Sequence, residues 1–282
     1  MRVKRLRSTF AAEIEGVDLS QPMTDDAFAA IREAWLDNKV VVFHDQKLEE
    51  EDILSFGKRF GELEIHVRND AGSRRNPEIL LVTNKKENGK ALGVLGDSEA
   101  AWHVDQIYMQ RPTFGTMLYG IDIPPAGGNT YVCDLASLYD RFPDTLKKRV
   151  EGKRAINSAA YYNREYNAEM SEEQLKRVPD VSHPLVRTHP LRGRKSLFFS
   201  FNHTARIEGS TENESRALID ELKRFIAANT DLVYEHSWRP GDVLMWDNTS
   251  TMHRRDSFDG AHHLRLLKRI SFMYPQDCRT PV

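Results

Sequence analysis

The sequence predicts a mainly β fold with flanking helices that pack on the outside of a barrel or sandwich. Two amphipathic helices are expected near the N-terminus, and from Ile79 onward short apolar runs alternate with turns, which is the rhythm of strands. The last third continues this rhythm, with strands expected at 232–236, 242–246 and 263–272. No repeat, low-complexity linker or sharp change in composition divides the chain, so we expect a single domain over residues 1–282.

The composition favours a folded protein without an electrostatic footprint for nucleic acid. Hydrophobic residues make up 40% and charged residues 29%, which is typical of a chain with a buried core. Lys and Arg total 40 against 42 Asp and Glu, so there is no basic excess for nucleic acid. Cys133 and Cys278 are too few for a disulfide framework, and no segment resembles a signal peptide or a membrane span. We therefore expect a cytoplasmic location and no membrane partner.

The N-terminal elements are predicted from caps and apolar patterns. Thr24 precedes two aspartates that suit the positive end of a helix dipole, and an apolar stripe at helical spacing follows. Residues 39–43 are branched and aromatic, which predicts a strand buried on both faces. A second amphipathic helix is expected over 49–60.

Further elements are expected along the middle of the chain. The predicted strands are 79–83, 91–95, 116–122 and a hairpin of 183–188 with 195–199. A helix is expected over 139–150, and Thr211 with Glu214 forms a capping box for a helix that reaches about residue 228. The polar, tyrosine-rich segment 159–178 is interpreted either as a mobile lid or as an ordinary surface excursion.

One stretch, Trp102-His-Val-Asp105, carries candidate metal ligands. Side chains alternate along an extended segment, so His103 and Asp105 point to the same side and can hold one ion together. With a distant second histidine they would form the facial triad of non-haem iron(II) oxygenases. About one such triplet is expected by chance in a chain of this composition, so the motif alone does not decide the function.

The third ligand is expected from a later strand. His253 is the preferred candidate, because it follows a buried-looking strand and the turn-forming pair Asp247-Asn248. The alternatives on the same reasoning are His203, His262 and His263.

Polar side chains on two later strands are candidate anion ligands. Period two places Arg265 and Arg269 on one face of the C-terminal strand, about 13 Å apart along the backbone. Inside a barrel each guanidinium would need an anion, whereas on an outer face both would simply be solvated. Thr130 follows the Gly127-Gly128 turn. Either its hydroxyl points inward and donates to a ligand, or the threonine is present only because it favours a strand.

Taken together, these stretches resemble the taurine dioxygenase and phenoxyacetate dioxygenase family of iron(II)/2-oxoglutarate-dependent oxygenases. The motifs that carry the resemblance are Phe56-Gly-Lys-Arg-Phe-Gly-Glu-Leu63, Trp102-His-Val-Asp105, Gly127-Gly-Asn-Thr130, Trp246-Asp-Asn248 and the stretch from His253 to Arg269. The resemblance implies a double-stranded β-helix (jelly-roll, cupin-like) core. It implies Fe(II), 2-oxoglutarate and O2, and hydroxylation of a small organic anion, coupled to decarboxylation of 2-oxoglutarate to succinate and CO2. It also implies an oligomer of two or four copies.

The same resemblance implies roles for individual residues. The implied iron ligands are His103, Asp105 and His253, the implied ligands of the far carboxylate of 2-oxoglutarate are Thr130 and Arg265, and the implied substrate-binding residues are Arg269, His66 and His203. His203 stands where taurine dioxygenase has a phenylalanine, which argues against taurine as the substrate. A carboxylate, sulfonate or sulfate ester is expected instead, and hydroxylation beside a heteroatom would cleave the bond between carbon and that atom.

Two other functions suit parts of this pattern. A jelly-roll that held zinc would act as a Lewis-acid hydrolase or isomerase. A jelly-roll without catalytic activity would bind a small anion through the same two arginines, although a complete metal triad would then have no purpose.

Overall fold

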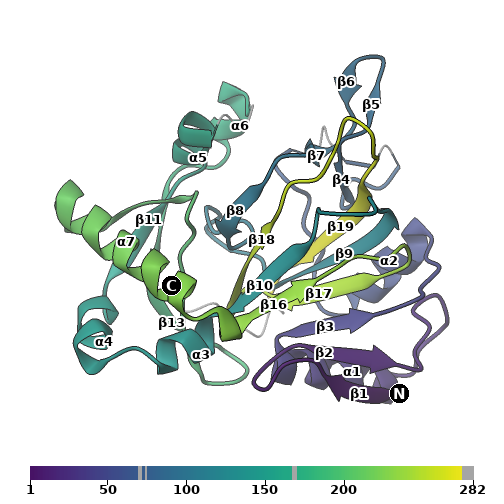
Figure 1. Ribbon diagram of the computed structural model, residues 1–282, viewed down its shortest axis with the longest axis horizontal. Coiled ribbons are helices and arrows are strands. Elements are labelled where there is room, and N and C mark those ends of the chain that lie inside the picture. Colours follow the sequence, from purple (N-terminus) through teal and green to yellow (C-terminus); the bar gives the residue numbers. More distant parts are fainter. Residues whose placement is uncertain (69–71, 74, 167–169, 275–282) are drawn as a thin grey trace.

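The computed structural model describes residues 1–68, 72–73, 75–166 and 170–274. Two β-sheets form its centre, and helices lie on both sides of them (Figure 1). The larger sheet has the strand order β1 (Arg2–Arg5), β2 (Ala12–Glu15), β3 (Val40–Phe43), β17 (Val243–Asp247), β9 (Gly115–Asp122), β19 (Leu266–Phe272), β4 (Leu80–Thr83) and β7 (Val94–Leu95). The mainly β prediction with flanking helices is confirmed.

The second sheet carries most of the candidate metal ligands. Its order is β16 (Val233–His236), β10 (Thr130–Asp134), β18 (Thr251–Arg255) and β8 (Ala100–His103), all antiparallel. Strands from distant parts of the chain are therefore neighbours, and this pairing brings the middle of the sequence against its last third (Figure 1).

Strand β17 shows how period-two alternation builds two cores from one sheet. Leu244 and Trp246 lie on the inner face, in a buried cluster that includes Val132 of the second sheet. Val243 and Met245 lie on the outer face, in the cluster that the N-terminal helices cover. The strand is therefore buried along its whole length, which explains its nearly continuous apolar sequence.

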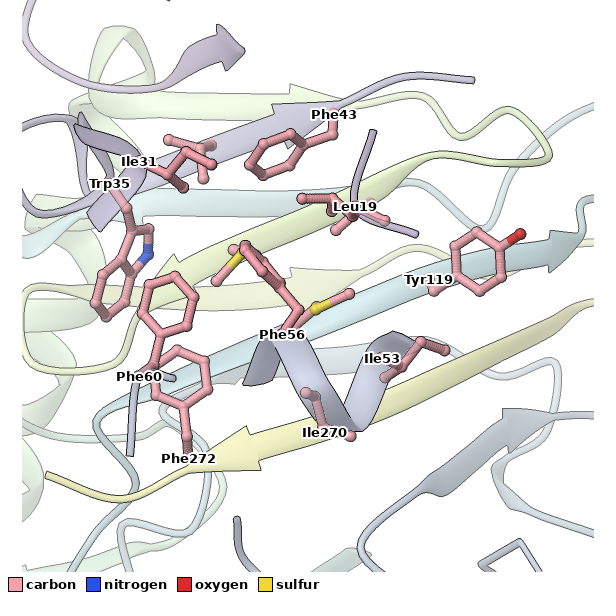
Figure 2. Close-up of a cluster of buried hydrophobic side chains, with 14 of the residues drawn as sticks. Leu19, Ile31, Trp35, Phe43, Ile53, Phe56, Phe60, Tyr119, Ile270 and Phe272 are labelled. Atoms are coloured by element: carbon pink, nitrogen blue, oxygen red, sulfur yellow. The ribbon is translucent and has the colours of Figure 1, made fainter. Parts of the chain in front are cut away.

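The helices α1 (Asp25–Asn38) and α2 (Glu50–Lys58) cover the outer face of the larger sheet, as the sequence predicts. Trp35 of α1 packs edge-to-face on Phe60 at a centroid distance of 5.4 Å, and Phe60 stacks on Phe272 of β19 at 4.9 Å (Figure 2). Such aromatic pairs add to the free energy gained by apolar burial. They fix β19, and with it the arginine-bearing face of this strand, against the helices.

A further buried cluster lies against the second sheet, on the face that points away from the larger sheet. The remaining elements belong to this side or to short surface hairpins: α3 (Leu135–Asp140), α4 (Asp144–Val150), β11 (Arg154–Asn157), α5 (Ala159–Tyr166), α6 (Glu172–Lys176), β12 (Val181–Pro184), β13 (Val186–Thr188), β14 (Lys195–Leu197), β15 (Thr204–Ile207), α7 (Glu212–Ala228), a 3-10 turn (Thr230–Leu232), β5 (Lys86–Glu87) and β6 (Lys90–Ala91). The predicted capping box of Thr211 and Glu214 begins α7.

Several predicted boundaries were wrong for identifiable reasons. The helix expected over 139–150 is two helices, because Pro143 lacks an N–H and begins α4 instead of continuing α3. The strand expected over 91–95 is divided between β6 and β7 at Gly93, where a side chain would meet the carbonyl oxygen of Leu81 at 2.3 Å. The strand expected over 263–272 begins at Leu266.

The segment 159–178 contains the helices α5 and α6, with residues 167–169 outside the description. Within the described parts of the chain, no helix is both long enough and apolar enough to cross a membrane. Cys133 is a buried free thiol, and Cys278 lies outside the described residues.

Candidate active site

Three of the predicted site residues converge where β8 pairs with β18. His103 ends β8, Asp105 lies in the turn that follows, and His253 is opposite His103 in the register of the two strands. Nε2 of His103 and Nε2 of His253 lie 3.8 Å and 3.7 Å from Oδ1 of Asp105. One possible ligand atom of each residue lies within 4.8 Å of the others, an arrangement that no other described group of His, Cys, Asp or Glu matches.

The protonation states suit metal binding. Burial lowers the pKa of His103 and of His253, so both imidazoles are neutral at pH 7. Nδ1 of His103 lies 2.7 Å from the carbonyl oxygen of Ala101, which can only accept, so the proton is on Nδ1 and the lone pair of Nε2 faces the triad. Burial alone would raise the pKa of Asp105, but Arg269 and the two histidines hold it below its ordinary value.

Two imidazole nitrogens and one carboxylate oxygen on adjacent positions are the donor set of non-haem Fe(II) sites, so these residues fit iron. The other histidines considered for the third position lie elsewhere. His262 pairs with Asp259 at 2.8 Å on the surface, and His263 is exposed. His203 lines the cavity beside the triad.

A small cavity next to the triad contains both predicted ligands of an anion, Arg265 and Thr130. Arg265 is 1% exposed, its Nη2 donates to the carbonyl oxygen of Gly128 at 3.0 Å, and its Nε and Nη1 have no hydrogen-bond partner. Burial lowers the pKa of Arg265 to about 9, so the guanidinium is still charged at pH 7. A buried charge with two unused donors points to an anionic ligand, and the carboxylate of 2-oxoglutarate fits it.

Trp238 and Gly128 hold these two predicted ligands in place. Thr130 accepts a hydrogen bond from Nε1 of Trp238 at 3.0 Å, which leaves its own hydroxyl proton free for the cavity. Gly128 has a φ of +69°, and a Cβ there would lie 2.9 Å from Nε of Arg265. The glycine in the Gly127-Gly128 turn is therefore required for the arginine to lie against the backbone.

A larger cavity of about 450 Å³ also borders His103 and Asp105 of the triad. Its wall includes His66, His203 and Arg269, the predicted substrate-binding residues, and the rings of Tyr108 and Tyr162. His203 lies between the two tyrosines, at centroid distances of 5.0 Å from Tyr108 and 4.4 Å from Tyr162. Burial lowers the pKa of His66 and of His203 to about 3, so both are neutral and polar.

Arg269 reaches both the cavity and the triad. Its Nη2 lies 3.2 Å from Oδ1 of Asp105 and donates to Oγ of Ser271 at 3.0 Å. His66 accepts a hydrogen bond from the backbone N–H of Arg68 on Nδ1 at 3.0 Å, so the neutral ring carries its proton on Nε2. Nε2 of His66 lies 3.4 Å from the hydroxyl of Tyr108, and Arg68 also lines the cavity, so an anion there would meet two cations and a neutral donor pair.

Sequence reasoning missed several residues of the site. Tyr108 and Tyr162 are contributed by a turn and by α5, and neither stands in a motif with metal or anion chemistry. Trp238 follows β16 and is recognised only through its contact with Thr130. Leu95 lines both cavities with a φ of +71°, a backbone conformation that the sequence does not suggest for leucine.

Comparison with known proteins identifies the family. Residues 2–271 match the family described as "Taurine catabolism dioxygenase TauD, TfdA family". The chain belongs to this family. It is 33% identical over 267 residues to the alpha-ketoglutarate-dependent 2,4-dichlorophenoxyacetate dioxygenase of Cupriavidus pinatubonensis, covering 90% of this chain and 91% of that protein. It is 32% identical over 262 residues to the (S)-phenoxypropionate/alpha-ketoglutarate-dioxygenase of Sphingobium herbicidovorans, covering 90% and 88%.

A solved structure agrees with these matches. The crystal structure of AAD-2 in complex with Mn(II) and N-oxalylglycine superposes with a TM-score of 0.83 at 28% identity, covering 98% of each chain. The resemblance drawn from the sequence and the jelly-roll core are thus confirmed. This TauD/TfdA family member is a 2-oxoglutarate-dependent dioxygenase that uses Fe(II), 2-oxoglutarate and O2. The zinc hydrolase and the non-catalytic anion binder are not favoured.

Proposed function

We propose that this dioxygenase hydroxylates a small organic anion that Arg269 holds beside the metal. The observation that supports the proposal is that two cavities border His103 and Asp105, with Arg265 lining only the smaller cavity and Arg269 lining both. Two anions are therefore expected at once, and 2-oxoglutarate accounts for the one at Arg265.

Separate groups of side chains would bind the metal and 2-oxoglutarate. His103, Asp105 and His253 would hold Fe(II), which with bound 2-oxoglutarate supplies C–H oxidation by O2 and releases succinate and CO2. Arg265 and Thr130 would fix the far carboxylate of 2-oxoglutarate through the two unused guanidinium donors and the free hydroxyl proton.

On the substrate side, Arg269 would pair with the anionic group, and the Nε2 proton of His66 would donate to the same group in place of the Tyr108 hydroxyl, which lies 3.4 Å away. His203, held between Tyr108 and Tyr162, would form a polar aromatic wall along the rest of the substrate. These rings and the volume of about 450 Å³ favour a planar ring joined to a carboxylate over a compact sulfonate.

Relatives support the same substrate class. The two relatives named above are called dioxygenases of a phenoxyacetate and of a phenoxypropionate, and a yeast relative that is 28% identical over 262 residues is called a sulfonate dioxygenase. An aryloxyalkanoate hydroxylated beside its ether oxygen would break down to a phenol and an oxoacid, which is the cleavage expected of this chain.

Succinate formation on a panel of substrates tests the proposal. Phenoxyalkanoates, alkyl sulfates, sulfonates and amino-acid-like carboxylates would each be supplied with Fe(II), 2-oxoglutarate and O2, with Zn(II) in a parallel reaction. We expect succinate formation that depends on the organic substrate in the Fe(II) reactions and none in the Zn(II) reactions. The rate should be highest with a phenoxyalkanoate. Turnover with Zn(II), or succinate formation that no organic anion accelerates, would contradict the proposal.

Three expectations of the sequence stay predictions: a single domain over residues 1–282, a homo-oligomer of two or four copies, and a cytoplasmic location. Light scattering after size-exclusion chromatography would measure the assembly.

A further inference from the structure

The two oxygens of the Asp105 carboxylate have different neighbours. Oδ1 faces the histidines, 3.8 Å from Nε2 of His103 and 3.7 Å from Nε2 of His253. Oδ2 accepts a hydrogen bond from Oγ1 of Thr116 at 2.6 Å. Asp105 as a whole residue is 4% exposed and Thr116 is fully buried, so water does not compete for this contact. One oxygen is thus presented to the metal site and the other is already occupied.

The direction of the Thr116 hydrogen bond follows from its other contacts. A hydroxyl group has one proton to donate and two lone pairs that accept. Oγ1 of Thr116 accepts from Nδ2 of Asn248 at 3.0 Å and lies 3.3 Å from Oγ of Ser271. An ionised carboxylate only accepts, so the single proton of Thr116 goes to Asp105 and its lone pairs receive the other two groups.

Asn248 is oriented by a group that can only donate. The indole Nε1 of Trp246 lies 3.1 Å from Oδ1 of Asn248, which places the amide oxygen toward the indole and the NH2 group toward Thr116. The same NH2 group donates to Oγ1 of Thr113 at 3.2 Å, and Thr113 donates to the backbone oxygen of Asp105 at 3.3 Å. Both the side chain and the backbone of Asp105 are held from the ends of β9 and β17.

We propose that Thr116 is a positioning residue that keeps Asp105 a one-oxygen ligand. This inference rests on the proposed role of Asp105 in metal binding. A carboxylate binds a metal ion through one oxygen or through both. With Oδ2 held by Thr116, Asp105 fills one coordination position, so the remaining positions stay available to 2-oxoglutarate and O2. Without the hydroxyl, the carboxylate is free to rotate about its Cβ–Cγ bond, so Oδ1 is no longer held toward the two histidines and the ligand set is no longer in place for the metal.

Three variants separate positioning from packing. Thr116→Val removes the hydroxyl and keeps the shape, Thr116→Ser keeps the hydroxyl, and Thr251→Val is the matched control. Thr251 is fully buried and donates to the backbone oxygen of Asp247 at 2.7 Å, with no contact to Asp105. The probe is Mn(II), added to metal-free protein in a calorimeter, and the melting temperature in chelator is measured for each variant. His103→Ala serves as the reference for loss of a ligand.

We expect Thr116→Val to weaken Mn(II) binding by about 10- to 100-fold, as changes behind a ligand typically do. Thr116→Ser should restore the wild-type affinity, and Thr251→Val should lower the melting temperature without a change in affinity. Wild-type affinity in Thr116→Val, or equal losses in Thr116→Ser, would overturn the positioning role. If His103→Ala also binds Mn(II) normally, the ligand assignment fails as well. Should Thr116→Val not fold, Thr116→Ala is judged by the same criteria.

Discussion

Nη2 of Arg269 lies 3.2 Å from Oδ1 of Asp105, so the arginine that lines the proposed substrate cavity also offsets the charge of a proposed metal ligand. Both side chains are nearly buried, at 12% and 5% exposed. In such surroundings a carboxylate without a counter-charge is strongly disfavoured, which makes this pair important for the stability of the metal-free protein. The same guanidinium therefore links stability to the substrate binding proposed for it.

Arg269→Met is expected to lower the unfolding free energy of the metal-free protein by about 3 kcal/mol, because Asp105 is left buried and unpaired. A divalent cation should return part of this loss, since it supplies positive charge at the same carboxylate. Urea unfolding in chelator and in Mn(II) measures both quantities. The variant should also raise the KM for the organic substrate more than the KM for 2-oxoglutarate.

Lys268→Met is the matched control for this prediction. Lys268 is the preceding residue, and its Nζ pairs with Glu50 at 3.1 Å in a partly exposed position. Such pairs contribute roughly 0 to 1 kcal/mol, so the control should lose little stability. Equal losses in the two variants, or a loss in Arg269→Met that Mn(II) does not reduce, would show that Arg269 does not compensate Asp105.

Arg265→Met is expected to weaken the binding of 2-oxoglutarate without lowering the stability of the protein. The loss of charge-assisted hydrogen bonds to a carboxylate should raise the KM for 2-oxoglutarate by roughly 10- to 100-fold. The metal-free protein should be as stable as the wild type or more stable, because the variant removes a buried charge whose Nε and Nη1 have no hydrogen-bond partner. Steady-state kinetics and thermal unfolding check the two parts, and a large loss of stability would show that the guanidinium is structural.

Gly128→Ala should weaken 2-oxoglutarate binding without touching the metal ligands. The new Cβ would lie 2.9 Å from Nε and 3.1 Å from Cδ of Arg265, so the arginine must move. Gly152→Ala is the control, because Gly152 has a φ of +70° and no atom within 4 Å of its added Cβ. Both variants should lose about 1 kcal/mol of stability from the left-handed backbone, but only Gly128→Ala should raise the KM for 2-oxoglutarate. Equal KM values in the two variants would contradict this account.

The periodicity of the sequence predicted the elements that bury an apolar face and not the places where the chain departs from regular structure. The stripe that includes Trp35 and the capping box of Thr211 follow from local spacing, and both are found. Arg265 was expected within a strand, but it precedes β19, and a bulge after Leu266 shifts the register. Its side chain still points into the anion cavity, because the backbone N–H is held by Asn84 at 2.9 Å.

Contacts between residues far apart in the chain could not be predicted from the sequence. The pairing of β8 with β18 explains why His253, and not His262 or His263, lies with His103, and pairing depends on the whole sheet. Residues that act through another group, such as Trp238 behind Thr130, carry no motif of their own. For the same reason, a short motif is enough to suggest the family, but the residues that support its ligands are found only in the structure.

Glu64 is expected to make stability fall as the pH rises toward neutrality. Burial raises the pKa of Glu64 from 4.5 to about 7, and Asp105 adds to the rise, while Arg269 and the nearby amide of Gln106 oppose it. Between pH 4.5 and about 7 the folded protein therefore keeps a proton that the unfolded chain releases. This proton stabilises the fold below pH 4.5, and the stabilisation is lost as the pH rises through about 7.

Comparison of wild type with Glu64→Gln isolates this effect, since His66 and His203, with a pKa of about 3, titrate alike in both proteins. From pH 4.5 to 8, the wild type should lose roughly 2 kcal/mol relative to the variant, after allowance for partial exposure of the carboxyl group. Urea unfolding in chelator measures the difference, and Glu62→Gln, at an exposed position two residues away, is the control and should show no trend. A constant difference between wild type and Glu64→Gln over this range would mean that Glu64 is ionised throughout, with Arg269 as its partner.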